Sequence, residues 1–263
     1  MLKSMTNKGE DINAVKIFSV PFTICNFADG IRRIEKIIAD RKPHLLVLAN
    51  THTLNLAYEI SEFKEVLTGE KSLVLRDGIG IAWALKKRDI SPLHNFVGTT
   101  FIPEFCKATS HRGYRVYLLG ARPGIAELAA KKLSSLAPGI VIAGFHHGYF
   151  PEGQTAEIIS RINDSVPHIL LVAMGNPKQE LWIAKNLHRL NAPLCIGVGG
   201  MFDYLSGLVP RAPGWMLQAR MEWVFRLLIE PRRLWKRYII GNPKFIMRVY
   251  RECLGKNHNN KPG

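Results

Sequence analysis

Residues 168–183, HILLVAMGNPKQELWI, contain the unit that recurs along this 263-residue chain. Residues 168–174 form a run that is apolar after its first residue, the run ends at a glycine, and a helix-like stretch, 178–189, follows. A short run that is apolar on both faces is typical of a parallel strand covered by helices on each side.

Five other short apolar runs have the same character: 44–50, 72–75, 114–119, 140–145 and 194–198. Helix-like stretches separate them, at 28–41, 53–68, 78–88, 123–136 and 153–164. This alternation predicts an α/β fold, with a Rossmann-like parallel sheet sandwiched by helices.

The last part of the chain has a different pattern. Residues 214–238, GWMLQARMEWVFRLLIEPRRLWKRY, are helical in pattern, and Pro231 divides them into two helices. Polar residues spaced by four predict a narrow stripe on an otherwise apolar helix; they are Gln218, Glu222, Arg226 and Glu230. We expect a Rossmann-like core over 1–204, a helical basic C-terminal appendage over 205–253 and a disordered tail over 254–263.

The formal net charge of +15 is unevenly distributed. Residues 211–252 hold ten Lys and Arg against three Asp and Glu, a surplus of seven in that stretch. A basic surface attracts nucleic acid, anionic lipid or phosphorylated small molecules, and charge alone does not choose between them.

The location of the protein is indicated by what the sequence lacks. No run approaches the ~18 apolar residues that a membrane-spanning helix needs, and the first residues lack the apolar region of a secretion signal. The four cysteines are scattered, as is typical of reduced thiols in a cytosolic protein. We expect a cytoplasmic protein that lies on a membrane without spanning it.

Polar side chains stand where the first two runs end. Asn50 closes the run 44–50, and Asp77 follows 72–75 and precedes a glycine. Because the carboxyl ends of parallel strands share one edge, both are catalytic candidates there. Asp77 can act as a general base toward a sugar hydroxyl. The alternative is a plain turn or helix N-cap.

Three later strand ends carry candidate ligand contacts. Gly120 and Arg122 can hold a diphosphate, or the glycine can serve only a tight turn. The cluster after 168–174 suits a ribose or a phosphate, or is a solvated helix start; its members are Gly175, Lys178 and Gln179.

Asp203 and an aromatic residue are the candidates for a nucleobase. Asp203 follows three glycines and can accept hydrogen bonds from a base edge, or be an ordinary loop residue. Phe145 or Tyr149 can stack on the base. The adjacent His146 and His147 would point to opposite faces of a strand, so they do not predict a shared metal.

Taken together, these segments resemble the WecG/TagA/CpsF glycosyltransferase family. The matching stretches occur in family order over about residues 15–250 and include ANTHTLNLA (49–57), RDGIGIAWAL (76–85), GFHHGYF (144–150), LLVAMGNPKQELWI (170–183) and GVGGMFDYLSGLVPRAPGWM (197–216). The resemblance implies an inverting, metal-independent transferase with no cofactor. Its donor would be UDP-activated N-acetylmannosamine, its uronic acid or glucose, and its acceptor a sugar on polyprenyl diphosphate, in cell-surface polysaccharide synthesis.

The resemblance also assigns residues. It makes Asp77 the base, Asp203 a uracil contact and Gln179 a ribose contact. Arginines of the appendage would reach the diphosphate while the appendage sits on the membrane; the matching candidates are Arg211, Arg226, Arg232, Arg233 and Arg237.

Two departures from the family pattern stand out. Leu48 occupies a place where relatives can carry Thr, so no role is carried to it. Arg76 precedes Asp77 where Pro is common in relatives, and an adjacent cation would favour the ionised carboxylate.

The arginines link the charge surplus to the chemistry. The sequence has no DxD motif of the kind that holds a metal under a leaving diphosphate, and guanidinium groups are the physical substitute. The appendage tryptophans Trp215, Trp223 and Trp235 suit a lipid headgroup boundary. They can instead pack on the sheet domain or on a second copy of the chain, which leaves a homo-oligomer open.

Two other classes of protein compete with this interpretation. A nucleotide-cofactor enzyme such as a dehydrogenase would need a GxGxxG that opens the first βα unit, and the chain lacks it. A basic nucleic-acid-binding or membrane-binding protein is the other alternative. We find no nucleic-acid-binding motif, and Glu222 and Glu230 interrupt the basic segment.

Overall fold

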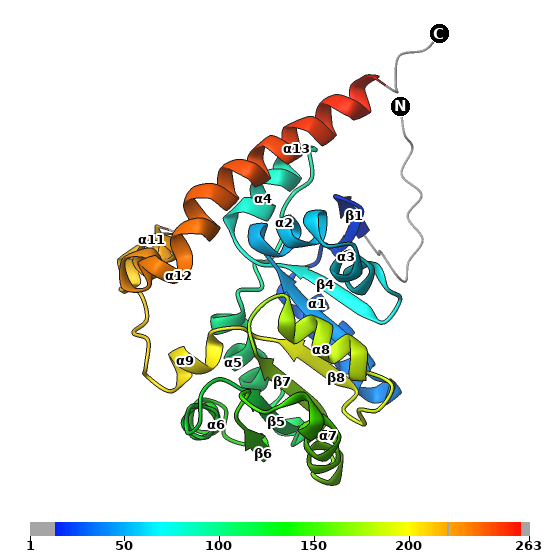
Figure 1. Ribbon diagram of the computed structural model, residues 1–263, viewed down its shortest axis with the longest axis vertical. Coiled ribbons are helices and arrows are strands. Elements are labelled where there is room, and N and C mark those ends of the chain that lie inside the picture. The colour runs from blue at the N-terminus through cyan, green and yellow to red at the C-terminus, as the bar shows by residue number, and fades with distance from the viewer. Residues whose placement is uncertain (1–13, 220, 259–263) are drawn as a thin grey trace.

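The computed structural model describes residues 14–219 and 221–258. Its centre is a parallel six-stranded sheet in the order β4-β3-β8-β7-β5-β6 (Figure 1). The strands are β3 (His44–Ala49), β4 (Ser72–Arg76), β5 (Arg115–Gly120), β6 (Val141–His146), β7 (Ile169–Ala173) and β8 (Leu194–Gly197). All six predicted strands are confirmed.

Helices cover both faces of the sheet. In β3, Leu45 and Val47 enter one apolar cluster and Leu46 and Leu48 the other. The first layer is built mainly from α2 (Thr51–Glu59), α3 (Ser61–Thr68), α4 (Ile79–Lys86), α7 (Thr155–Asp164) and α8 (Lys178–Asn186). The second is built from α1 (Phe27–Asp40), α5 (Gly98–Ala108), α6 (Ile125–Leu136) and α9 (Met201–Leu205). The predicted Rossmann-like sandwich is confirmed.

Some elements differ from the sequence-based prediction. The single helix expected over 53–68 is two helices, because Ile60 is extended (φ −120°, ψ 106°) between α2 and α3. Helix α5 was not predicted, and Pro103 within it disguises the helical pattern. The hairpin of β1 (Ala14–Ile17) and β2 (Val20–Thr23) was also missed. Its turn residues Phe18 and Ser19 have positive φ without the usual glycine or asparagine signal.

The C-terminal segment is a chain of helices: α10 (Gly214–Gln218), α11 (Glu222–Ile229), α12 (Pro231–Trp235), the π-helical turn η3 (Lys236–Ile240) and α13 (Gly241–His258). Pro231 begins a new helix, as predicted. The predicted continuous polar stripe was wrong, because α10 ends at Gln218 before α11 begins. Residues 254–258 are helical rather than disordered, and 259–263 lie outside the described residues.

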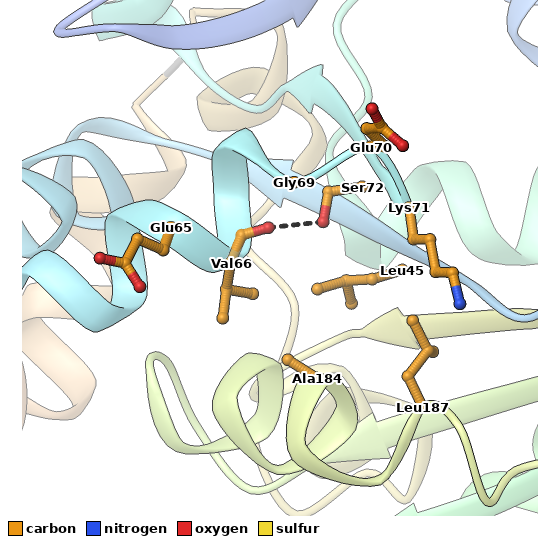
Figure 2. A pocket seen from close by; sticks show the side chains of 9 residues that line it. All are labelled: Leu45, Glu65, Val66, Gly69, Glu70, Lys71, Ser72, Ala184 and Leu187. Atoms are coloured by element: carbon orange, nitrogen blue, oxygen red, sulfur yellow. Dashed lines mark hydrogen bonds between the residues drawn. The ribbon is translucent and has the colours of Figure 1, made fainter.

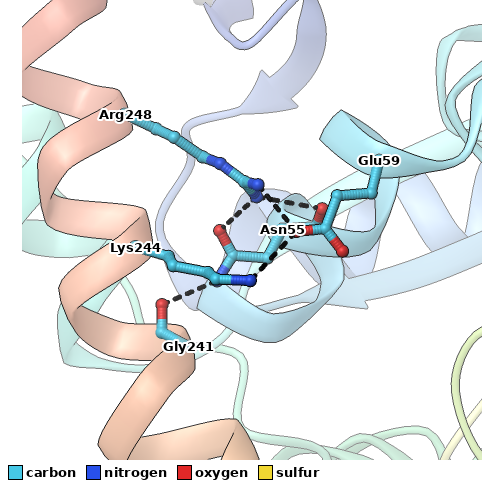
Figure 3. A network of polar contacts seen from close by, with 5 residues as sticks. All are labelled: Asn55, Glu59, Gly241, Lys244 and Arg248. Carbon is cyan, nitrogen blue, oxygen red and sulfur yellow. Dashed lines mark hydrogen bonds and ion pairs between the residues drawn. The ribbon is translucent and has the colours of Figure 1, made fainter.

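Helix α13 lies across α2 and α4 (Figure 1). Phe245 and Val249 are buried in the core. A polar network joins α13 to α2 (Figure 3): Asn55 Nδ2 donates to the Gly241 carbonyl (2.7 Å), and Arg248 donates to Asn55 Oδ1 (2.8 Å) and Glu59 Oε1 (2.6 Å). Thr51, the first residue of α2, donates from Oγ1 to Asn242 Oδ1 (3.0 Å), and this contact holds the start of α13, with η3 before it, beside the amino end of α2.

None of the helices in the described part of the chain is both long enough and apolar enough to cross a membrane.

Candidate active site

The candidate site lies at the carboxyl edge of the sheet, where the loops after β3 and β4 touch. Asn50 is the N-cap of α2, and its Oδ1 accepts hydrogen bonds from the backbone N–H groups of His52 (3.1 Å) and Thr53 (3.2 Å). Because Oδ1 is used in this way, the Asn50 amide nitrogen is left to donate to the carboxylate of Asp77, which it does. The Asp77 backbone N–H donates to the Ala49 carbonyl (2.8 Å). The two catalytic candidates are therefore brought together.

The Asp77 carboxyl is half-buried, and desolvation raises its pKa to about 6. Arg237, the Asn50 hydrogen bond and Arg226 act in the opposite direction, while Glu222 adds to the rise. A carboxyl that titrates near neutral pH is suited to accept a proton in the reaction.

The sequence suggested that Arg76 would favour the ionised form of Asp77, but its guanidinium binds the loop at residues 92–95. Its guanidinium is buried and donates to the carbonyls of Pro92 (2.8 Å) and Leu93 (3.0 Å) and to Asn95 Oδ1 (3.1 Å). The cations that favour ionised Asp77 come instead from the C-terminal helices.

Those helices bring arginines to the same edge. A β-carbon placed on Gly200 would lie 3.4 Å from Arg226 Nη2 and 3.7 Å from both Arg233 Nη2 and Asp203 Oδ2. Gly200 therefore lies beside two guanidinium groups and the Asp203 carboxyl. Arg237, on η3, is close enough to Asp77 to lower its pKa, while burial lowers the pKa of Arg237 itself.

Polar atoms in this cluster lack partners. The Arg226 guanidinium lies over the Tyr204 ring, 5.0 Å from its centroid. Arg226 Nε and the Tyr204 hydroxyl are buried with no hydrogen-bond partner. Buried polar groups in native proteins are normally paired, so these two atoms mark a place where a ligand can bind.

Asp203 and Arg122 also meet in this region. Burial raises the pKa of Asp203, and Arg233, Arg122 and Arg226 oppose that rise. Arg122 comes from the loop after β5, so the site draws cations from the sheet domain and from the C-terminal helices. That Asp203 contacts a base stays a prediction.

The glycine predicted at the diphosphate has a packing role. A β-carbon on Gly120 would lie 2.4 Å from the Ala173 carbonyl oxygen, so glycine is required for the approach of β5 to β7. Gly148 packs against Gly120 and donates its N–H to the Ala121 carbonyl (2.9 Å), which brings the Tyr149 loop beside the β5 loop. A phosphate contact from Gly120 stays a prediction.

The cluster after β7 divides into an exposed and a buried part. Gly175 and Lys178 are exposed, whereas Gln179 is 3 % exposed and its amide is engaged by the protein. Gln179 Oε1 accepts from the backbone N–H groups of Gly175 (3.2 Å) and Gly199 (3.0 Å). Sequence reasoning missed this bracing role, and the ribose contact stays a prediction.

Three predicted residues are less closely associated with the cluster. Arg232 is exposed, Tyr149 is 69 % exposed, and the exposed Arg211 donates to Thr100 Oγ1 of α5 (2.7 Å). Sequence reasoning also missed His52, whose pKa falls to about 4 because of burial and then of Arg237. Its place in the strand-end motif 49–52 is the one signal that could have found it.

A cavity of about 310 Å³ lies at the opposite edge, where β3 and β4 begin (Figure 2). It contains apolar side chains and two carboxylates, Glu65 and Glu70, and none of the predicted site residues. Among the described residues, no group of three His, Cys, Asp or Glu side chains is arranged to hold a metal ion.

Fold and site together define a Rossmann-like α/β protein in which a carboxyl with a raised pKa faces a cluster of guanidinium groups. This combination suits an enzyme that removes a proton while it holds an anionic leaving group. The chain belongs to the glycosyl transferase WecG/TagA/CpsF family, whose model matches residues 15–259.

Similar proteins carry a common name. The chain is 31 % identical over 238 residues to the N-acetylglucosaminyldiphosphoundecaprenol N-acetyl-beta-D-mannosaminyltransferase of Bacillus subtilis strain 168, covering 90 % of this chain and 91 % of that protein. It is 30 % identical to the proteins of the same name from Bacillus spizizenii (87 % of this chain, 90 % of that protein) and from Staphylococcus aureus strain NCTC 8325 / PS 47 (88 % and 89 %).

Proposed function

We propose that this glycosyltransferase is an inverting, metal-independent enzyme that moves a hexose from a UDP-sugar to a sugar on polyprenyl diphosphate. The observation that carries the proposal is the convergence of Arg226, Arg233 and Arg237 on the strand edge that holds Asp77. The names of the relatives support a lipid-linked acceptor and make N-acetylmannosamine our first candidate donor.

In the proposed reaction, an acceptor hydroxyl attacks the anomeric carbon from the face opposite UDP. The new bond joins the acceptor oxygen to that carbon, the bond from the carbon to the UDP oxygen breaks, and Asp77 takes the hydroxyl proton. Arg226 and Arg237 would neutralise the charge that develops on the leaving diphosphate. The partnerless Arg226 Nε supports a ligand at that position.

We propose that residues 1–204 form the catalytic core and that 205–253 form an appendage bound to the inner face of the cytoplasmic membrane. Large apolar side chains are exposed along these helices: Trp215, Trp223, Leu228, Trp235, Ile239, Met247 and Tyr250. Exposed cations lie among them, so the surface suits anionic lipid. Docking there would bring the arginine cluster to a lipid-linked acceptor.

Transfer should persist in excess EDTA. In the proposed reaction, guanidinium groups neutralise the charge that develops on the leaving diphosphate, and a chelator does not remove them. The measurement is UDP release from enzyme freed of metal, with and without EDTA, and with Mg²⁺ or Mn²⁺ added back. A strict metal requirement would overturn the arginine argument.

Neutralising the exposed cations with Arg232→Gln, Lys236→Gln and Arg251→Gln should release the protein from anionic liposomes. At roughly 1 kcal/mol per cation near the surface, the partition coefficient should fall about 100-fold. Sedimentation with vesicles of 30 % phosphatidylglycerol would measure it.

The matched control neutralises three exposed lysines elsewhere, Lys71, Lys107 and Lys132. This variant should bind the vesicles as the parent protein does. Equal binding by both triple variants and the parent would count against docking through the C-terminal helices.

The test of the function is turnover. UDP-N-acetylmannosamine, its uronic acid and UDP-glucose would each be offered with a short-chain N-acetylglucosaminyl diphospholipid. We expect one donor to yield a product heavier by one hexose derivative, with the anomeric configuration inverted. Failure of all donors, together with no UDP binding, would reject the proposal.

A further inference from the structure

Gln179 holds two loops of the candidate site together. Its Oε1 accepts hydrogen bonds from the backbone N–H groups of Gly175, in the loop after β7, and Gly199, in the loop after β8. Both glycines have positive φ, at +83° and +54°, a backbone conformation that favours glycine. The residue after Gly199 is Gly200, against which Arg226 and Arg233 lie.

Both hydrogen bonds therefore depend on the orientation of the Gln179 amide. If the amide were rotated by half a turn, its NH₂ group would face two N–H donors, and both bonds would be lost. In the observed orientation Nε2 donates to Glu180 Oε1 at 2.7 Å. A carboxyl oxygen is an acceptor, so the Glu180 side chain selects the orientation that serves both glycines.

Burying the Glu180 carboxyl in this position costs free energy. It is 2 % exposed, its Oε2 has no hydrogen-bond partner, and no cation of the described residues forms an ion pair with it. A β-carbon on Gly197 would lie 2.7 Å from both Gln179 Nε2 and Glu180 Oε1, so β8 ends in glycine to admit the pair. Burial raises the pKa of Glu180, while hydrogen bonds from the side chains of Gln179 and Asn176 and from the Glu180 backbone act in the opposite direction.

We propose that Glu180 is a positioning residue for the donor: its carboxyl orients the Gln179 amide, which fixes the β7 and β8 loops and so sets Gly200 and Asp203 against the arginines. Glu180 does not touch the reacting atoms. The inference rests on the proposed function for its ligand, a UDP-sugar.

The experiment compares Glu180→Met with Glu180→Gln. Glu180→Met removes the acceptor and leaves the Gln179 NH₂ group buried and unpaired. We expect the donor KM and the calorimetric Kd of UDP to rise about tenfold, with kcat changed less than about threefold. Glu180→Gln keeps an acceptor oxygen and should restore both constants to within about twofold. Glu157→Met, at an exposed position on α7, is the control and should match the parent.

Amide hydrogen exchange without any ligand tests the brace independently. The Gly175 and Gly199 amides should exchange slowly in the parent and in Glu180→Gln, and faster in Glu180→Met. If Glu180→Met does not fold, Gln179→Met should show the same faster exchange at both amides. Unchanged exchange in the folded variant would overturn the inference.

Other outcomes are also decisive. A lower melting temperature for Glu180→Met with unchanged UDP affinity would make Glu180 merely structural. Loss of kcat in Glu180→Gln as large as in an Asp77 variant would make it a catalytic acid or base. A parent protein that binds no UDP would reject the proposed function, while the exchange data would still decide whether Glu180 braces the loops.

Discussion

Asp77→Asn should reduce kcat by about 10³-fold while the Kd of UDP stays within about twofold of the parent value. Asparagine keeps the size of the side chain but cannot take a proton from the acceptor hydroxyl. The arginines that would hold UDP remain in place, so binding should survive. Single-turnover transfer and UDP calorimetry on the same preparation would separate the two effects.

The stability of this variant provides a second check. Since burial raises the pKa of Asp77 to about 6 in the folded protein, ionising the carboxyl opposes folding. Stability is then lost as pH rises from the unfolded pKa toward about 6, and Asp77→Asn should melt no lower than the parent at pH 7. Asp40→Asn, at the exposed end of α1, is the control and should turn over normally. Full turnover by Asp77→Asn would remove Asp77 as the base.

Arg237→Gln should lower kcat/KM by about 10²-fold or more. Two effects combine, because Arg237 would stabilise the leaving diphosphate and also lowers the pKa of Asp77. A base must be ionised to act, so parent activity should fall as pH drops through about 6. Without Arg237 the pKa of Asp77 rises further, and the acid limb of the pH–rate profile should move to higher pH.

Two comparisons isolate those effects. Arg237→Lys keeps the charge but loses the planar fork, so the acid limb should stay near its parent position while kcat/KM recovers only in part. Arg32→Gln, at an exposed position on α1, should leave the profile unchanged. If the acid limb did not move in Arg237→Gln, Asp77 would not be the group that titrates in the profile.

The sheet could be predicted because each of its strands has a recognisable local sequence pattern. Runs such as 44–50 and 168–174 are apolar on both faces and lie between helix-like stretches. The elements that were missed depend on context. The hairpin turn at Phe18 and Ser19 carries no turn signal, and Ile60 breaks a helix with no glycine or proline. Tertiary packing decides such cases.

The sequence allowed the residues of the candidate site to be predicted, but not which of them interact with one another. Asp77 and the arginines could be selected from their motifs, but which cation faces Asp77 depends on how the C-terminal helices fold back. The neighbour in sequence, Arg76, binds a loop, whereas Arg237, far along the chain in the C-terminal helices, lowers the pKa of the Asp77 carboxyl. Likewise, no sequence pattern states that Gln179 is used by two backbone amides.

The most direct measurement is a crystal structure of the full chain with UDP bound. We expect UDP at the carboxyl edge of the sheet, with its diphosphate bonded to Arg226 and Arg237. The Asp77 carboxyl should be free on the side where the acceptor enters. A nucleotide bound elsewhere, or a diphosphate at this edge that the C-terminal arginines do not touch, would contradict the proposed function.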